Sequence, residues 1–478
     1  MKRTFAPVML CAFLAAAVSA TADEFTFKDA QGETQTLHAR LAGSGEGLFA
    51  LELEDGRWEL VEESAIVSRK PSDDPVPITA DQMAKRLEEK FTAPLFEYRV
   101  AAPYVVGVVL TAPMDEETRP RVDRFLDKAT TFMQSIDRMF TRFAEARELP
   151  LQPPRFPLVM LIFETDADFN TYTALVTGGR GPSTQNILGF YSAVSNWLAI
   201  RLDECDSFAV PLHEAIHQQV FNRGILQRLA PLPVWFNEGI ATGFENDGGK
   251  ISVDPTRVSR QYGGNARQKF KLRFEEIIEQ DDAFRGDVLA GEAYTLAWCL
   301  HWLVVMAKPQ EYTQYVRKLG SIEPLSDPSR RDRLAEFQET FGLDPKSLEQ
   351  TIGQELTAAA RRERVKLVPP SVPVGKLITQ DQMGRLEIGL VQRGDKGGLV
   401  QGTGKIKNLS PFRTLTFHVT AAQSGRGIAW LAERVSPGRS ADLERQLMPP
   451  SGGRGYAISI RSAIPGSEAE KTLMALPR

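Results

Sequence analysis

The stretch Pro211-Leu-His-Glu-Ala-Ile-His217 places two histidines four residues apart. In a helix this spacing puts His213 and His217 one turn apart on the same face, where two imidazoles can hold one Zn²⁺ at about 2.0–2.1 Å. Pro211 is tolerated in a first helical turn, and apolar residues recur every three to four positions, so we predict a helix from near Pro211 through Phe221. Glu214 would act there as the general base toward a zinc-bound water.

A catalytic zinc site usually combines three protein ligands with an open fourth position. The candidate for the third ligand is Glu238, in the second stretch Trp235-Phe-Asn-Glu-Gly-Ile-Ala241. The chain has only five His, so a chance H-E-x-x-H is improbable, on the order of a few per thousand. The alternative interpretation is a helix with two structural histidines and no metal.

The two stretches together resemble the gluzincin branch of zinc metallopeptidases, in which H-E-x-x-H is followed by a more distant glutamate ligand. The segment from Trp235 to Ala241, with Glu245 shortly after it, is similar to the W-L-N-E-G-F-A segment of the neutral aminopeptidases. This resemblance implies zinc as the cofactor, Glu214 as the base, and three metal ligands: His213, His217 and Glu238.

The sequence departs from the neutral aminopeptidases in two respects. The interval from His217 to Glu238 is longer, and no G-x-M-E-N element, which anchors a substrate's free amino end, precedes His213. The resemblance therefore does not imply aminopeptidase activity. The overall layout is closer to secreted bacterial gluzincin-like proteins with a peptidase-MA-like domain, some of which are grouped as a domain of unknown function.

Length and composition are typical of a globular protein. The 478 residues allow about three domains, with 42% hydrophobic and 25% charged residues. The net charge is −4, and no clustered basic face of the kind that binds nucleic acid is apparent, so we expect no nucleic-acid partner. The expected partner is a peptide or protein substrate, and the oligomeric state stays open.

Residues 1–22 have the pattern of a secretory signal peptide. Lys2 and Arg3 precede an apolar run from Val8 to Val18, and small-residue cleavage sites end at Ala20 and Ala22. The apolar run is too short for the ~20 residues of a comfortable membrane span. We therefore expect a mature protein without a stable membrane span, either secreted or located in the periplasm or cell envelope.

Beyond the leader, the cysteines are Cys205 and Cys299. Export permits a disulfide between them, but two cysteines do not define a disulfide framework. Cys205 directly precedes the predicted metal helix, so it is also a candidate metal ligand. We favour a buried free thiol.

The predicted fold class is α+β, with three domains after the leader. Residues 23–70 alternate like five short strands and resemble a small SH3-like β-barrel, which either binds a peptide or packs on its neighbour. Residues 79–366 are expected to form a zincin-like catalytic domain, a small sheet with helices. Residues 376–478 resemble an immunoglobulin-like β-sandwich.

Residues 187–191 and 196–202 are predicted to form a hairpin that leads directly into the metal helix. In the resembled families the strand before that helix is the sheet edge that faces the cleft. We therefore expect Trp197–Arg201 to be an exposed edge that can bind an extended peptide as an added strand. The glycine-rich stretch 178–181 before the hairpin predicts a loop that does not match a phosphate-binding motif.

Hydrolysis of an amide develops negative charge on the former carbonyl oxygen, and a donor aimed at that oxygen contributes roughly 3–4 kcal/mol. Related gluzincins use a Tyr or His from a later helix for this purpose, which makes Tyr294 the candidate donor. His301, seven residues further along the same predicted helix face, is the second choice. The alternative is that Tyr294 belongs to an aromatic core face with Trp298 and Trp302.

These features predict a secreted zinc peptidase in which Glu214 activates a zinc-bound water for hydrolysis of peptide bonds. One alternative is an envelope or surface binding protein that retains a peptidase scaffold and binds through its flanking β domains. Another is a hydrolase of cell-wall peptides. The sequence leaves the substrate open, and it also leaves open whether Asp203 or Glu245 hydrogen-bonds to the ligands.

Overall fold

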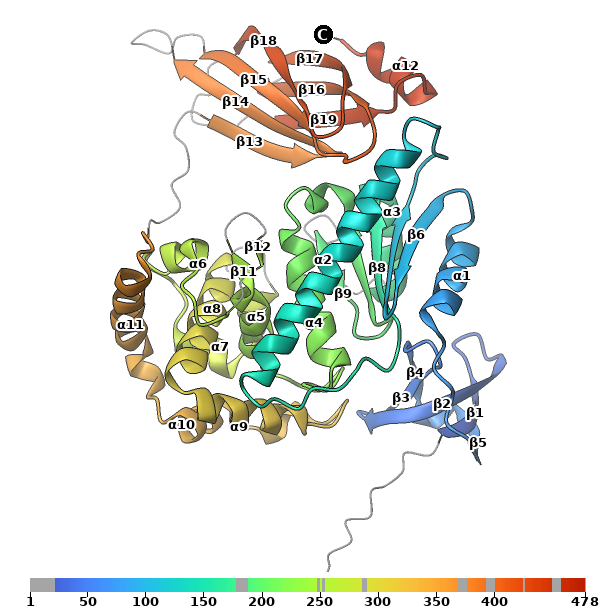
Figure 1. Cartoon of the computed structure of the whole chain (residues 1–478), viewed down its shortest axis with the longest axis vertical. Coiled ribbons are helices and arrows are strands. Elements are labelled where there is room, and N and C mark those ends of the chain that lie inside the picture. Colours follow the sequence, from blue (N-terminus) through green and yellow to red (C-terminus); the bar gives the residue numbers. More distant parts are fainter. Residues whose placement is uncertain are drawn as a thin grey trace, which may run out of the picture.

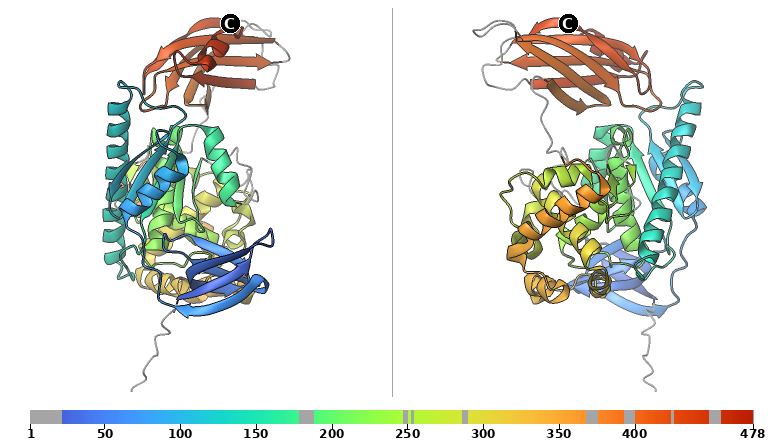
Figure 2. Two further views of the ribbon diagram at one scale, coloured as in Figure 1. Left: turned by 90° about the vertical axis from the view of Figure 1, so that its right-hand side faces the viewer. Right: turned by 60° about the vertical axis from the view of Figure 1, so that its left-hand side comes forward.

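The computed structural model describes residues 22–177, 188–246, 250–251, 254–285, 290–367, 376–392, 400–423, 426–448 and 457–477. The predicted leader, apart from Ala22, and the glycine-rich stretch 178–181 lie outside these residues. The chain is a mixed α+β structure with several antiparallel sheets. An N-terminal sheet and a C-terminal β unit lie at opposite ends of a central α/β unit (Figures 1 and 2). None of the described helices is both long enough and apolar enough to cross a membrane.

The N-terminal sheet consists of β1 (Ala22–Lys28), β2 (Thr34–Gly45), β3 (Leu48–Glu52), β4 (Trp58–Glu62) and β5 (Ile66–Ser72). They pair antiparallel in the order β4-β3-β2-β1-β5, which confirms five strands in this part of the chain. Among the described residues β4 and β5 are unpaired edges, so the sheet is open and the predicted SH3-like barrel is not closed. Alternation and turns mark strands in a sequence, whereas closure depends on strand curvature and stagger, which bulges in β1 and β2 alter here.

The central sheet consists of β6 (Phe96–Ala101), β7 (Tyr104–Val109), β8 (Leu158–Phe163), β9 (Gly189–Tyr191) and β10 (Trp197–Arg201), in the order β6-β7-β8-β10-β9. β7, β8 and β10 run parallel, and the two outer strands are antiparallel to their neighbours. β8 and β10 are buried along their whole length, as their nearly continuous apolar sequences require. β9 and β10 form the predicted hairpin.

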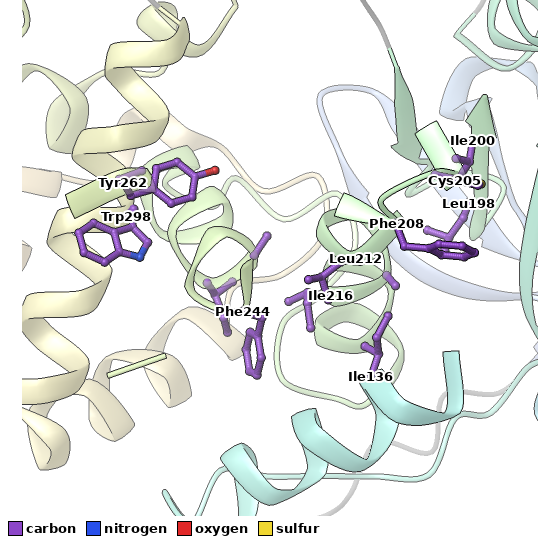
Figure 3. Close-up of a cluster of buried hydrophobic side chains, with 14 of the residues drawn as sticks. Ile136, Leu198, Ile200, Cys205, Phe208, Leu212, Ile216, Phe244, Tyr262 and Trp298 are labelled. Carbon is purple, nitrogen blue, oxygen red and sulfur yellow. The ribbon is translucent and has the colours of Figure 1, made fainter. Parts of the chain in front are cut away.

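Four helices cover the two faces of the central sheet. They are α1 (Ala80–Phe91), α2 (Arg119–Glu145), α3 (Asp166–Thr177) and α4 (Ala209–Asn222). α2 and α4 pack on one face, where Ile136 of α2 and Leu212 of α4 share a buried cluster with Leu198 and Ile200 of β10 (Figure 3). α1 and α3 pack on the other face together with Trp197. The apolar face of α4, which is the predicted metal helix, thus packs against the sheet.

A helical half follows α4 in the chain (Figure 1). Its elements are α5 (Val234–Gly243), β11 (Glu245–Asn246), β12 (Lys250–Ile251), α6 (Arg260–Asn265), α7 (Phe274–Glu279), α8 (Ala290–Ala307), α9 (Pro309–Gly320), α10 (Arg333–Phe341) and α11 (Leu348–Glu363). α5 and α8 approach closely because Gly239 and Gly243 face His301 without side chains of their own. A Cβ on Gly239 would lie 2.7 Å from His301 Cβ and 2.8 Å from the Ala297 carbonyl oxygen. This close approach sets Glu238, the residue before Gly239, beside α8.

Gly239→Ala is expected to lower the free energy of unfolding by about 1–3 kcal/mol, because the added methyl group overpacks the contact between α5 and α8. Chemical denaturation followed by circular dichroism measures this change. Gly353→Ala in α11 is the matched control, since nothing lies within 4 Å of a Cβ built at Gly353. The control is expected to be neutral or stabilising. Equal stability of the two variants would contradict the close packing.

The C-terminal unit consists of β13 (Lys376–Asp381), β14 (Gly384–Gln392), β15 (Val400–Asn408), β16 (Leu415–Gln423), β17 (Arg426–Val435), β18 (Ser440–Met448), β19 (Ala457–Ala463) and α12 (Glu468–Met474). The strands form two antiparallel sheets, β13-β14-β15-β18 and β17-β16-β19. Arg413 docks this unit on the central one, because its Nε donates to Glu164 Oε1 at 2.7 Å and both side chains are buried. Phe412 packs against Phe125 of α2 beside this ion pair.

Candidate metal centre

α4 carries the H-E-x-x-H residues and confirms the predicted helix, with Pro211 in its first turn. Leu212 and Ile216 belong to the buried cluster that also contains Leu198 and Ile200 of the sheet (Figure 3). Because residues four apart share a face, His213 and His217 lie together on another side of the helix, toward α5.

Three side-chain atoms converge between α4 and α5. His213 Nε2 lies 3.1 Å from His217 Nε2 and 2.9 Å from Glu238 Oε2, and His217 Nε2 lies 3.5 Å from the same oxygen. A tetrahedral zinc with ligand bonds of about 2.0–2.1 Å has ligand atoms about 3.3–3.4 Å apart. The three predicted ligands therefore fit one face of a tetrahedral zinc site. No other group of His, Cys and carboxylate side chains in the described part of the chain converges in this way.

Glu245, the first residue of β11, contacts His213, one of the three converging side chains. Its Oε1 lies 2.7 Å from His213 Nδ1, and its Oε2 accepts a hydrogen bond from the Tyr262 hydroxyl at 2.8 Å. A carboxylate at Nδ1 keeps the proton on that nitrogen and leaves Nε2 free to bind a metal. Tyr262 stacks on Trp298, and its hydroxyl points away from the indole (Figure 3). The sequence left the role of Glu245 open and carried no signal for Tyr262.

Burial and hydrogen bonding have opposite effects on the pKa values of His213 and Glu238. Burial disfavours charge on His213, yet its hydrogen bonds to Glu238 and Glu245 raise its pKa well above the usual value. Burial also disfavours charge on Glu238, but attraction to His217 and the hydrogen bond to His213 outweigh burial and lower the pKa of this carboxyl. A metal cation that binds here must therefore displace a proton from His213.

Glu214 lies next to the ligands without being one of the three converging side chains. Its Oε2 accepts a hydrogen bond from the backbone N–H of Tyr191 in β9 at 2.8 Å. Burial raises the pKa of Glu214, although His213 and His217 oppose that shift. A carboxylate whose pKa is raised and which is held through one oxygen can take up a proton on the other.

Tyr294 of α8 lies beside the converging side chains. Its ring centroid is 6.0 Å from that of His213, and its ring also packs on Phe284. Burial raises the pKa of the Tyr294 hydroxyl, and the carboxylates of Glu238 and Glu214 raise it further, so the hydroxyl keeps its proton and can donate a hydrogen bond. The Trp298 and Trp302 side chains instead stack on each other in the core.

His301, the second choice for the oxyanion donor, is not in the site. It is fully buried between α5 and α9, and its Nε2 lies 3.1 Å from the Tyr312 hydroxyl. The prediction was wrong because α8 is buried on nearly every side, so seven-residue spacing from Tyr294 does not determine which face a residue occupies.

Other candidates from the sequence also lie elsewhere. Asp203 accepts a hydrogen bond from Gln380 Nε2 at 3.2 Å, so it contributes to docking of the C-terminal unit and not to the ligands. Cys205 and Cys299 are both buried and free, which confirms the interpretation that we favoured. Burial raises the pKa of both thiols.

Among the described residues, the sheet edge beside the site is β9 and not β10. β10 pairs with β8 on one side and with β9 on the other, so Trp197–Arg201 is an interior strand and the predicted edge is corrected. The prediction took the strand directly before the metal helix as the edge, whereas the first strand of the hairpin pairs outside it. The N–H of Tyr191 on this edge strand faces Glu214.

Residues 207–326 match the family model described as "Protein of unknown function (DUF1570)". The matched segment includes the three converging ligands, Glu214 and Tyr294. No curated protein matches the chain. The family match thus spans the candidate metal centre without assigning an activity to it.

Glu245→Gln is expected to weaken zinc binding about 10–100-fold, because a neutral amide holds the His213 ring less firmly and makes it a weaker ligand. Titration of metal-free protein with zinc, in competition with a chromophoric chelator, measures the change. Tyr262→Phe is the control, since it removes one hydrogen bond to Glu245 and keeps a ring against Trp298; its effect should be smaller. Unchanged affinity in Glu245→Gln would show that His213 does not depend on this carboxylate.

Proposed function

We propose that this protein is an exported, zinc-dependent peptidase. The observation that carries the proposal is the convergence of His213, His217 and Glu238 beside Glu214, a carboxylate that is not one of the ligands. Structural zinc sites usually close with four protein ligands, whereas three ligands leave a position for solvent and substrate. Among the described residues no fourth His, Cys or carboxylate side chain joins the group.

The three ligands would hold a zinc ion, which when bound would polarise the scissile carbonyl and lower the pKa of water. Glu214 takes the proton of the attacking water and passes it to the leaving amine. Tyr294 donates a hydrogen bond to the oxygen on which negative charge develops. Glu245 keeps the His213 ring in the orientation that presents Nε2.

We place the substrate along the outer side of β9, as an added strand. The hydrogen bond from Tyr191 N–H to Glu214 supports this placement, because it puts the edge strand directly beside the base. A crystal structure with a bound peptide-like inhibitor should reveal backbone hydrogen bonds from the inhibitor to Gly189 or to the carbonyl oxygen of Tyr191, whose N–H is already donated to Glu214. An inhibitor bound at the metal without contact to β9 would contradict the placement.

The test of the proposed function is peptide hydrolysis by purified protein of known metal content. Zinc is measured by mass spectrometry of the metal, and the protein is incubated with a peptide mixture before and after treatment with a chelator. The proposal predicts stoichiometric zinc and cleavage that chelation abolishes and added zinc restores. Cleavage that is indifferent to chelation, or equal activity of zinc-free protein, would contradict it.

The same experiment separates the two other functions considered from the sequence. Stoichiometric zinc without any cleavage would favour an envelope or surface binding protein that acts through its β units. Cleavage of muropeptides but not of protein-derived peptides would select a hydrolase of cell-wall peptides.

The proposal also includes the finer fold assignments. A zincin-like central unit is supported by the order of its elements, in which a small sheet precedes the helix with H-E-x-x-H and a helical half supplies Glu238. An immunoglobulin-like C-terminal unit is supported by its two antiparallel sheets. The N-terminal unit is assigned only as an open sheet of five strands.

A further inference from the structure

Arg228 joins the N-terminal sheet to the β9–β10 hairpin. It lies in the connection between α4 and α5 and is only 6% exposed. One nitrogen, Nη1, donates to the carbonyl oxygen of Gly56 in the N-terminal sheet unit at 2.8 Å and to that of Ala193 in the hairpin turn at 3.2 Å. The other, Nη2, donates to Glu52 Oε1 at 3.2 Å. A single buried guanidinium thus contacts both units.

Two further contacts reinforce this junction. The guanidinium of Arg228 lies over the ring of Trp58, 4.2 Å from its centroid. The backbone N–H of Trp58 donates to the carbonyl oxygen of Val194 in the hairpin turn at 2.8 Å. Trp58 of β4 therefore contacts the hairpin turn directly through its backbone N–H, and its ring also packs on Arg228, which binds the same turn.

Glu52 is the anchor of the junction on the side of the N-terminal sheet. This carboxylate is 6% exposed and accepts hydrogen bonds from Arg40, Arg155 and Arg228, and from the Trp58 indole. A buried carboxylate with several charge-assisted hydrogen bonds is held far more rigidly than an exposed ion pair. The N-terminal sheet is therefore fixed to the central unit and does not hang from it by a linker alone.

The hairpin connects this junction to Glu214, the proposed general base. Tyr191, on the strand that leads into the hairpin turn, donates its N–H to Glu214 Oε2 at 2.8 Å and its hydroxyl to Asn196 Oδ1 at 2.7 Å. Gln218 of α4 donates to the carbonyl oxygen of Asn196 at 3.3 Å. The position of the Glu214 carboxylate thus depends on the hairpin, and the hairpin turn is held by Arg228.

We propose that the N-terminal sheet is a brace for the candidate active site, and that Arg228 and Glu52 are positioning residues that hold the hairpin so that Tyr191 N–H fixes the Glu214 carboxylate. The consequence for catalysis rests on the proposed function. The brace itself is a property of the folded chain. It assigns the N-terminal sheet a role within the catalytic unit in place of separate peptide binding.

Arg228→Met tests the brace by hydrogen–deuterium exchange of the full-length protein. Loss of the hydrogen bonds from a charged donor should make the amides of residues 188–196, with Tyr191 among them, exchange about 10–100-fold faster. The amides of Leu158–Phe163 in β8 should keep their protection, and zinc stoichiometry should be unchanged. If Arg228→Met does not fold, Arg228→Lys is the second variant. Lysine keeps the positive charge but lacks the two separate donor nitrogens of the guanidinium, so it should give a smaller change in the same segment.

Arg155→Met is the matched control. Arg155 also pairs with Glu52, at 2.9 Å, but its other charged partner is Asp74 in the segment that follows β5. The hairpin amides should exchange at the wild-type rate in this variant. Wild-type exchange in a folded Arg228 variant, or equal acceleration in Arg155→Met, would overturn the proposal.

A second readout separates this proposal from the proposed function. If the wild-type protein hydrolyses peptides, Arg228→Met should lower kcat at least about tenfold with zinc still bound, because Glu214 is no longer held. Unchanged kcat in a variant whose hairpin exchanges faster would overturn the role in positioning Glu214. If the wild-type protein hydrolyses nothing, the exchange results still decide whether the brace exists.

Discussion

Glu214→Gln should keep stoichiometric zinc and lose peptide hydrolysis by about 10²–10⁴ in kcat, the range for removal of a general base. Zinc should remain because Glu214 is not one of the three side chains whose ligand atoms converge. The amide oxygen of Gln can still accept the hydrogen bond from Tyr191 N–H. What the substitution removes is the ability to take a proton from water.

The comparison with His213→Ala makes this result specific. Removing one of the two imidazoles takes away a ligand atom, so zinc and hydrolysis should both be lost. Both variants are measured by metal analysis of the purified protein and by steady-state kinetics on one cleavable peptide. Full turnover by Glu214→Gln would remove Glu214 from the mechanism, and loss of zinc in that variant would make it a ligand.

Tyr294→Phe should lower kcat about 10²–10³-fold with little change in zinc content, as expected for loss of one donor to a developing oxyanion. The ring of Phe can keep the packing against His213 and Phe284, so the fold should be unaffected. The effect should fall on kcat more than on KM, because the hydrogen bond strengthens as charge develops in the transition state.

Tyr262→Phe is the matched control for this substitution. Its hydroxyl is also buried near the ligands but is engaged by Glu245 Oε2, so its removal should affect zinc affinity and leave kcat nearly unchanged at saturating zinc. A Tyr294→Phe enzyme with wild-type kcat would return Tyr294 to the role of a packing residue.

The metal helix could be predicted because its signal is local. The spacing of His213 and His217 places both imidazoles on one side of any helix, and the apolar positions between them fix which side faces the core. The pairing of Glu238 with them came from resemblance to a family. Its physical basis is the packing of α5 beside α4 and its close approach to α8, the second of which Gly239 permits.

The supporting contacts could not be predicted because they join residues far apart in the chain. Glu245 lies 32 residues after His213 and contacts it only because of the path of the chain after α5. Tyr191 contacts Glu214 through a backbone N–H, which any residue type except proline could supply. In the sequence Arg228 is an ordinary loop arginine, and its burial follows from long-range contacts with the N-terminal sheet and the hairpin turn.

Two of the three errors have the same origin. His301 was placed from its spacing along α8, but a helix that is buried on nearly every side has no unique apolar face. The strand Trp197–Arg201 was placed at the edge from its order in the chain, but the other strand of the hairpin, β9, pairs on its outer side. Closure of the N-terminal sheet likewise depends on curvature that alternation of residues does not determine.

The central claim is tested most directly by anomalous X-ray scattering at the zinc absorption edge from crystals of the purified protein. The account predicts one strong anomalous peak between α4 and α5, at bonding distances of about 2.0–2.2 Å from His213 Nε2, His217 Nε2 and a carboxylate oxygen of Glu238. A crystal grown with zinc in excess that lacks a peak at this position, or a peak there with the Glu238 side chain turned away from it, would contradict the account.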